Sequence, residues 1–436
     1  MTLHYPELAE RVRSQRKLQP ELYGRIDFDS TPYRFTADPA DKSSLPGWVA
    51  EREPLLTDER IVELMHTATM LGDVVADPYA ALVPRYGVKG LIAMLRLACR
   101  EGIDSVADAP AELRAFLESM EAAPAWLDMD LVEEGARHSR IGAAFLSPFL
   151  IRGAFLATFL NTYAALPMAL TGALSGRRAA HRVHETASFF TVTTLPGALE
   201  RHGEGFEAAA MVRLMHSMVR YNALERSQQW DSSVYGVPVP QIDQMPAGLI
   251  GNYLLAVLAT RRGRSEFSTR ERAMLEFARY RCFLLGLPEE LLPTTAEGII
   301  EVFHARAALL RDGFDDATCG ELVRSTMTAY LRPGHTWFDR AADTVENSWS
   351  RAFFLGFCGG DRKAAAAMSV PLTAADAARV AVTAPFVILR FLFMTLASQR
   401  PALRKLTDIH TIRVVKKRLA TYGNPEYTTD ARAYPS

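Results

Sequence analysis

Apolar side chains recur at helical spacing along most of the chain, and this periodicity constrains the fold more than any other feature. Residues 58–71, DERIVELMHTATML, show an acidic start followed by apolar residues three and four positions apart. Sustained β alternation is absent, and residues 232–242, SSVYGVPVPQI, are interpreted as an extended loop because they contain two prolines. We therefore predict an all-α fold. Its further helices are expected over 89–103, 109–121, 129–170, 177–195, 204–229, 268–286, 296–312 and 314–331.

Helix-start signals agree with this periodicity. Thr373 and Asp376 form an acidic variant of the capping box, and Ser268 or Thr269 precedes another helical run. No internal repeat, low-complexity segment or linker divides the sequence. We predict one large helical domain. It consists of an N-terminal arm over 1–55, a main body over 56–335 and a C-terminal helical extension over 336–436 packed on the same domain.

Charge, cysteine spacing and the N-terminal sequence argue against a nucleic-acid-binding, disulfide-bonded or exported protein. The formal net charge of −1 gives no reason to expect a nucleic-acid partner. The four cysteines lie far apart in the sequence and form no metal-ligand spacing, so we expect free, buried thiols. The first residues contain no apolar export signal, which favours a cytoplasmic protein.

Two uncharged or nearly uncharged stretches raise the question of membrane contact. They cover residues 153–174 and 380–397, and a basic amphipathic tail follows at 404–423. The pattern favours helices buried on all sides in a large core. A membrane-spanning helix and a peripheral contact made through the basic tail are the alternatives.

The segment with the clearest chemical pattern is residues 204–230. Arg213, His216 and Arg220 occur at i, i+3 and i+7, within about 60° of one another on one helical face. Two nearby cations and an apolar setting favour the neutral imidazole, which is the form that binds a metal. Buried guanidinium groups in turn need anions. A haem would supply both an iron and two propionates, but a phosphate, a partner's carboxylates or simple packing also fit this spacing.

A second segment lies about one helix upstream, over residues 176–195. Arg182 and Thr186 share a face at i and i+4, and Glu185 lies between them in the sequence. Such donors could line the oxygen-binding side of an iron site, although a solvated helix start is an equally simple interpretation.

The RxxxT pair at Arg182 and Thr186, followed by RxxHxxxR at 213–220, resembles the latex-clearing-protein (rubber oxygenase) and mpaB-like oxygenase family. The segment 230–256, with its GVPxxQ sequence, is similar to that family as well. The resemblance covers roughly 55–330, so the main body at 56–335 would be the haem-binding catalytic domain.

The resemblance implies an all-α fold with a globin-like core that holds haem b. It implies that His216 is the proximal iron ligand and that Arg213 and Arg220 contact the propionates. Arg182 and Thr186 would lie on the distal side. The family cleaves carbon–carbon double bonds of isoprenoid chains with dioxygen.

The chain departs from the rubber-cleaving pattern at the distal acid. Those members carry a glutamate about one helix upstream of the RxxxT arginine, whereas residues 135–184 contain no acidic residue here and Leu166 lies near the expected place. Glu185 also replaces a lysine of those members. The acid is therefore either missing or provided by Glu185.

We therefore expect a haem b-dependent oxygenase that uses dioxygen on an apolar small molecule, isoprenoid-like or otherwise unsaturated. The catalytic candidates are Arg182, Thr186 and Glu185, and the cofactor-binding candidates are His216, Arg213 and Arg220. Two alternatives remain: a haem-binding protein without oxygenase activity, such as a sensor, a carrier or a peroxidase-like scavenger, and a haem-free, lipid-binding helical protein. The sequence fixes neither the substrate nor the oligomeric state.

Overall fold

Helices account for nearly all regular structure in the computed structural model, which describes residues 3–171, 178–423 and 425. Within these ranges there is no β-strand, only two isolated bridges, Phe35 with Leu310 and Ser43 with Arg311. Both bridges join the N-terminal arm to the end of one helix. The predicted all-α fold is confirmed.

The chain packs into two units, each assembled from separate stretches of sequence. Unit 1 comprises Met1–Val132 and Leu199–Gly313, and unit 2 comprises Glu133–Ala198 and Phe314–Tyr427. The arm, body and extension expected with boundaries at 56 and 336 do not follow these units, and that division stays a prediction. Part of the predicted extension, residue 424 and residues 426–436, lies outside the described residues.

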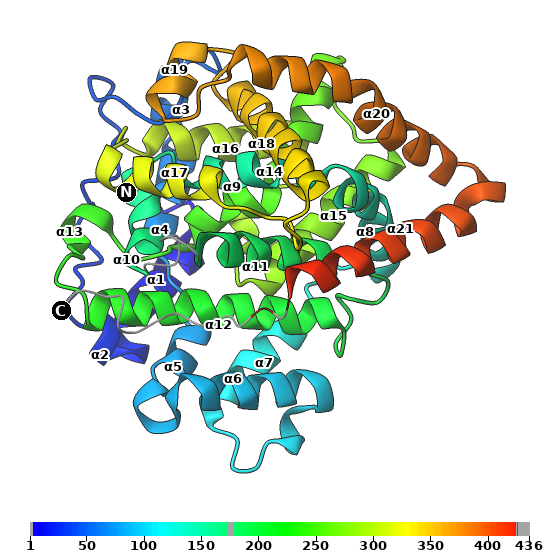
Figure 1. Ribbon diagram of the computed structural model, residues 1–436. Coiled ribbons are helices and arrows are strands. Elements are labelled where there is room, and N and C mark those ends of the chain that lie inside the picture. The colour runs from blue at the N-terminus through cyan, green and yellow to red at the C-terminus, as the bar shows by residue number, and fades with distance from the viewer. Residues whose placement is uncertain (1–2, 172–177, 424, 426–436) are drawn as a thin grey trace. The chain divides into compact units, whose positions relative to one another are not determined.

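Unit 1 is organised around helix α12 (Glu204–Glu225), which is buried on nearly all sides and packs against α5 (Ala76–Ala80) and α6 (Val83–Glu101) (Figure 1). Its alanines at 208–210 are almost fully buried and let neighbouring elements approach closely. The other helices of unit 1 are α1 (Pro6–Leu18), α2 (Pro20–Tyr23), α3 (Glu53–Thr57), α4 (Glu59–Thr69), α7 (Ala111–Glu121), α13 (Ser232–Tyr235), α14 (Gln241–Arg261), α15 (Thr269–Leu284) and α16 (Ala296–Leu309).

Unit 2 is organised around α18 (Trp337–Phe357), which packs against α9 (Ser147–Leu156) and α20 (Ala374–Ser398). Helix α8 (Met129–Phe145) enters this unit at Glu133. The remaining helices are α10 (Thr162–Leu170), α11 (Arg178–Val192), α17 (Glu321–Thr328), α19 (Arg362–Ala367) and α21 (Pro401–Tyr422).

Several predicted helix boundaries change in the structure. The helix expected over 129–170 is three helices and a short 3-10 segment, and Asn161 caps the last of them through its side chain. The loop expected over 232–242 starts with a helical turn, because Asp231 caps α13. Helix α14 was not predicted, and α18 lies in the helical extension expected over 336–436, for which no individual bounds were given. The capping boxes at Thr373 with Asp376 and at Ser268 with Glu271 are present.

The two apolar stretches have different environments. Residues 153–170 are divided among α9, a 3-10 turn and α10, and residues 172–174 lie outside the described part of the chain. Helix α20 is long and apolar enough to cross a membrane, yet only 11% of its most apolar window is buried. In the described ranges only the pair formed by α8 and residues Ser147–Phe159, bent by 95°, also meets that criterion. The expectation of a buried core helix over 380–397 is therefore wrong, because that helix packs on one side only.

One acid on α18, Glu346, is buried in unit 2. Glu346 has a side chain only 7% exposed and pairs with Arg332 through two contacts of 2.5 and 3.1 Å. Burial raises the pKa of Glu346, and the charge of Arg332 opposes that rise. Burial prevails, and the pKa of Glu346 is about 7.

This elevated pKa predicts a pH-dependent stability. The ordinary pKa is 4.5, so the folded state holds a proton on Glu346 that the unfolded state releases between pH 4.5 and about 7. Stability from this group is present below pH 4.5 and is lost as the pH rises through 7, by about 3 kcal/mol in total. The free energy of unfolding is measured by urea denaturation at pH 5 and pH 8. It should fall less between these two pH values in Glu346→Gln than in the wild type. The exposed Glu321→Gln should retain the wild-type decline. An equal decline in all three proteins would contradict the assignment.

Candidate functional site

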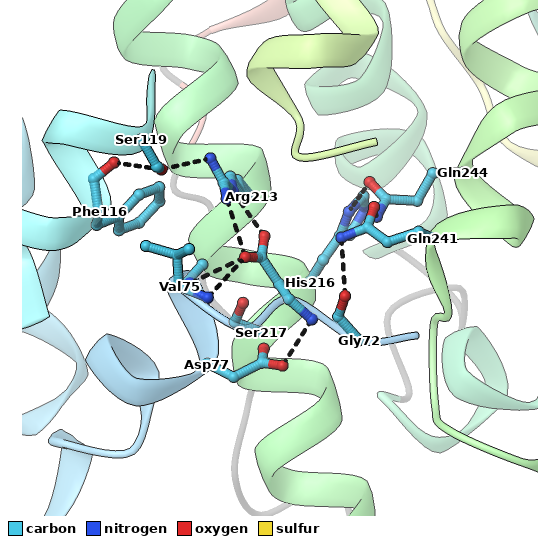
Figure 2. Close-up of polar contacts among 12 residues, drawn as sticks. Gly72, Val75, Asp77, Phe116, Ser119, Arg213, His216, Ser217, Gln241 and Gln244 are labelled. Carbon is cyan, nitrogen blue, oxygen red and sulfur yellow. Dashed lines mark hydrogen bonds and ion pairs between the residues drawn. The ribbon is translucent and has the colours of Figure 1, made fainter. Parts of the chain in front are cut away.

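Arg213, His216 and Arg220 all lie on α12, as the helical spacing predicted. Figure 2 labels Arg213 and His216 on this helix. Arg213 and Arg220 are 3% and 0% exposed, whereas His216 is half-buried. Burying two guanidinium groups in one helix requires anions nearby. The chain itself provides them.

Arg213 pairs with Asp73 in a bidentate arrangement. Its Nε and Nη2 atoms donate to the two carboxylate oxygens at 2.6 and 2.9 Å, and Nη1 donates to the Ser119 hydroxyl at 3.1 Å. Burial raises the pKa of Asp73, but the charge and hydrogen bonds of Arg213 outweigh burial and hold that pKa well below its usual range. Asp73 is therefore an anion when Arg213 is in place.

Arg220 pairs with Asp77 through a single hydrogen bond. Its Nε donates to the Asp77 carboxylate at 2.8 Å, and its remaining donors reach the Val239 carbonyl and the Ser217 hydroxyl at 2.8 and 2.9 Å. The Tyr23 hydroxyl donates to the second carboxylate oxygen of Asp77. Burial raises the pKa of Tyr23, and the negative charge of Asp77 raises it further, so Tyr23 stays a donor.

These contacts change the interpretation of the two arginines. The resemblance implied that haem propionates supply the anions for these arginines, but in the structure Asp73 and Asp77 supply them. Each pair joins α12 to the segment that begins α5. The arginines are thus neutralised within the protein and do not act on His216 as unpaired cations.

His216 is oriented by a chain of glutamine side chains. Its Nδ1 lies 2.9 Å from Oε1 of Gln244, and Nε2 of Gln244 donates to Oε1 of Gln241 at 2.7 Å. Nε2 of Gln241 then donates to the Gly72 carbonyl at 3.1 Å, as Figure 2 shows. We refer to Gly72, Gln241, Gln244 and His216 as the amide relay.

The direction of the amide relay fixes the imidazole tautomer. A carbonyl oxygen only accepts, so Gln241 must donate its amide N–H to Gly72 and present its oxygen to Gln244. Gln244 must then present its own oxygen to His216, which donates from Nδ1. In the neutral ring, Nε2 consequently carries the lone pair. A ligating histidine held by its other nitrogen in this way is typical of metal sites.

Gly72 belongs to the amide relay and also lies beside the Arg220–Asp77 ion pair. A Cβ atom at position 72 would collide with the Tyr23 hydroxyl and lie 3.0 Å from the Asp77 carboxylate. Gly286 lies beside the Arg213–Asp73 ion pair. Its φ is +88°, and a Cβ atom at this position would lie 2.9 Å from both Arg213 and Asp73. Only glycine fits both positions without displacing these pairs.

The three predicted distal residues lie on α11 of unit 2. Arg182 and Glu185 face each other, with Nη1 of Arg182 3.1 Å from the Glu185 carboxylate, and Glu185 is only 7% exposed. The other Glu185 oxygen lies 3.3 Å from Nε2 of His181. Thr186 is half-buried one turn beyond Arg182. Arg182 and Glu185 are therefore paired on one side of α11.

Sequence reasoning missed the residues that support His216. Asp73 and Asp77 are 140 and 143 positions from their arginines, and Gln244 is 28 positions from the histidine. One signal was available: two aspartates four residues apart in the apolar run LGDVVADPYA, residues 71–80. Buried acids at that spacing share one helical face and require cations.

Other groups are less suited to metal binding. The described residues contain no cluster of three or more His, Cys, Asp or Glu side chains that could hold a metal ion. All four cysteines are free and buried, as predicted. Burial raises the pKa of the Cys99 and Cys282 thiols to about 12, so both remain protonated at neutral pH.

The amide relay makes a spectroscopic prediction. In protein labelled with ¹⁵N-histidine, His216 should show a protonated Nδ1 and an unprotonated Nε2 at neutral pH, because Gln244 accepts from Nδ1. Gln244→Leu should lose this preference, whereas Gln244→Glu keeps an acceptor and should retain it. The signal is assigned by its absence in His216→Gln. Protonation on Nε2 in the wild type would refute the relay.

Comparison with known proteins identifies a family whose model matches this chain. Residues 140–389, more than half of the chain, match the model of the ER-bound oxygenase mpaB/B'/rubber oxygenase catalytic domain. This range contains α11, α12 and the amide-relay glutamines, whereas Asp73 and Asp77 precede it. A search of curated proteins found no match.

A solved structure of latex clearing protein in the closed state has a similar fold. The TM-score is 0.54 at 18% identity, over 81% of this chain and 91% of that one. This likeness supports the fold, and the family model carries the assignment. The chain belongs to the mpaB/rubber oxygenase catalytic-domain family of oxygenases.

Proposed function

We propose that this protein is a haem b-dependent oxygenase that uses dioxygen on an apolar, unsaturated or isoprenoid-like small molecule. The family supports an oxygenase. The observation that carries the haem assignment is the amide relay, since it makes Nδ1 of His216 the hydrogen-bond donor and so gives Nε2 the lone pair that a metal ligand needs.

The residues of α12 fit a haem in part. His216 is half-buried and of the right tautomer to bind iron, so we assign it as the proximal ligand. Arg213 and Arg220 are bound to Asp73 and Asp77, and we assign them as positioning residues that hold α12 in place rather than as propionate ligands. Haem b, when bound, supplies an iron centre that activates dioxygen.

The α11 residues would act on the oxygen side. Arg182 is a permanent cation and donor and would stabilise negative charge that develops on oxygen, and Thr186 would add a hydroxyl donor. Glu185 engages Arg182 with one carboxylate oxygen and lies near His181 with the other. We therefore assign Glu185 to orienting Arg182, with a proton-transfer role only if that pair opens.

A second candidate is a haem-binding protein without oxygenase activity, such as a sensor or carrier. Two observations favour it: residues 135–184 contain no acid, and Glu185 is held in an ion pair. Cytoplasmic location remains part of the proposal for either candidate.

Haem binding should depend on His216. The purified full-length protein, reconstituted with haem b, should show a Soret band with one iron per chain, and His216→Ala should lower haem affinity at least tenfold and shift the band. His216→Gly should recover a ligated spectrum when imidazole is added. The matched control is His304→Ala, which removes a half-buried histidine bound to Tyr253 at 3.0 Å and should leave the spectrum unchanged. Failure of the wild type to take up haem would refute the proposal.

Oxygen chemistry should depend on Arg182. With a panel of alkenes and short isoprenoids, Arg182→Ala should lower oxygen uptake by about 10²-fold at unchanged haem content, because a donor to developing charge is removed. Arg178→Ala, which changes an exposed arginine at the start of α11, is the control. Haem binding without oxygen uptake across the panel would favour the second candidate.

A further inference from the structure

Helices α20 and α21 of unit 2 expose a continuous row of large apolar side chains. On α20, Phe386, Leu389, Leu392, Phe393 and Leu396 are 77%, 64%, 45%, 67% and 61% exposed, and Leu406 on α21 is 65% exposed. We call these six residues the apolar ridge. Figure 1 shows α20 and α21 meeting at a corner.

Helix α20, which carries most of the apolar ridge, is anchored in the core of unit 2. The opposite side of α20 packs into a core through Met394, which is 8% exposed and contacts a cluster that includes Ile141 and Val415. Val387 is also buried. Both helices are therefore held in place within unit 2, and the apolar residues on their outward faces are exposed in the folded structure. A patch of this kind on a soluble chain generally marks a binding surface.

The surroundings of the apolar ridge are strongly basic. Residues 380–423 contain eight Lys or Arg side chains and a single acid, Asp408, which gives a net charge of +7. Asp408 lies 3.7 Å from Arg137 and so is already opposed by a cation. Lys405, Lys416 and Lys417 are exposed on α21. The whole chain, by contrast, has a net charge of −1.

We propose that the apolar ridge inserts into the interfacial region of a lipid bilayer with anionic head groups, with the lysines of α21 on the head-group phosphates. Exposed apolar residues flanked by cations are the composition of interfacial helices.

The geometry favours lying in the interface over crossing the bilayer. Arg390 stands midway along the apolar part of α20, with its guanidinium 4.6 Å from the centre of the Phe145 ring. A spanning helix would also have to withdraw Val387 and Met394 from the core of unit 2. Shallow insertion leaves both contacts intact.

The charge pattern also favours lipid over a second copy of the chain. A symmetric dimer through the apolar ridge would bring two segments of net charge +7 against each other. Anionic lipid neutralises the same charge.

The test is co-sedimentation of the full-length protein with phosphatidylcholine vesicles containing 0% or 30% phosphatidylserine. The wild type should bind the anionic vesicles at least tenfold more tightly. Phe386→Ser with Phe393→Ser should lower binding to both at least tenfold. Lys405→Gln with Lys416→Gln and Lys417→Gln should abolish the preference for anionic vesicles and spare weak binding to neutral ones.

The matched control is Leu254→Ser with Leu258→Ser, which removes two exposed apolar side chains from α14 of unit 1 and should bind vesicles as the wild type does. Circular dichroism confirms that each variant is folded. A wild type that stays in the supernatant, or an unchanged Phe386/Phe393 variant, would overturn the proposal. So would a lipid-free dimer, measured by light scattering, that this variant converts to monomer, because a second copy would then cover the ridge.

Discussion

Two buried ion pairs between α12 and the start of α5 are the constraint on which the candidate site depends. Arg213 and Arg220 are fully desolvated, and removing either aspartate would leave an uncompensated buried charge at a cost of about 3–5 kcal/mol. Such pairs add little stability compared with apolar packing, but they permit only one register between their two elements. The position of His216 is set by that register, because it lies between the two arginines on one helix.

The same segment also sets the chemistry of the imidazole. Gly72 directly precedes Asp73, and its carbonyl is the acceptor that gives the amide relay its direction. One short stretch therefore fixes both the place of α12 and the tautomer of His216. The aspartates remove the cationic field that was expected to keep the imidazole neutral, so the ligand role of His216 rests on the amide relay, which decides which nitrogen of the neutral ring is protonated.

Sequence reasoning succeeded where the physics is local. Helical periodicity, the capping boxes and the spacing of Arg213, His216 and Arg220 depend on neighbours within a few turns, and the structure contains them. The anions on those arginines could not be predicted in the same way, because Asp73 and Asp77 are about 140 positions away and meet them only after packing. Periodicity reports that a side chain is buried, but it does not report its partner. Arg182 and Glu185, by contrast, are three positions apart on α11, so their pairing is local and helical spacing was sufficient to predict it.

The apolar stretches show the same limit for burial itself. Both 153–170 and 380–397 have the composition of a core helix, but the first is broken into short elements and the second presents its apolar side to the outside. Composition measures the preference for leaving water and does not specify whether protein or lipid replaces it. Charge does distinguish them, because the exposed stretch belongs to a segment, residues 380–423, of net charge +7, whereas residues 153–171 carry no charge. The proposed bilayer contact depends on the apolar ridge of unit 2, and the proposed haem ligand is His216 of unit 1. Because the two proposals depend on different residues, either can fail without the other.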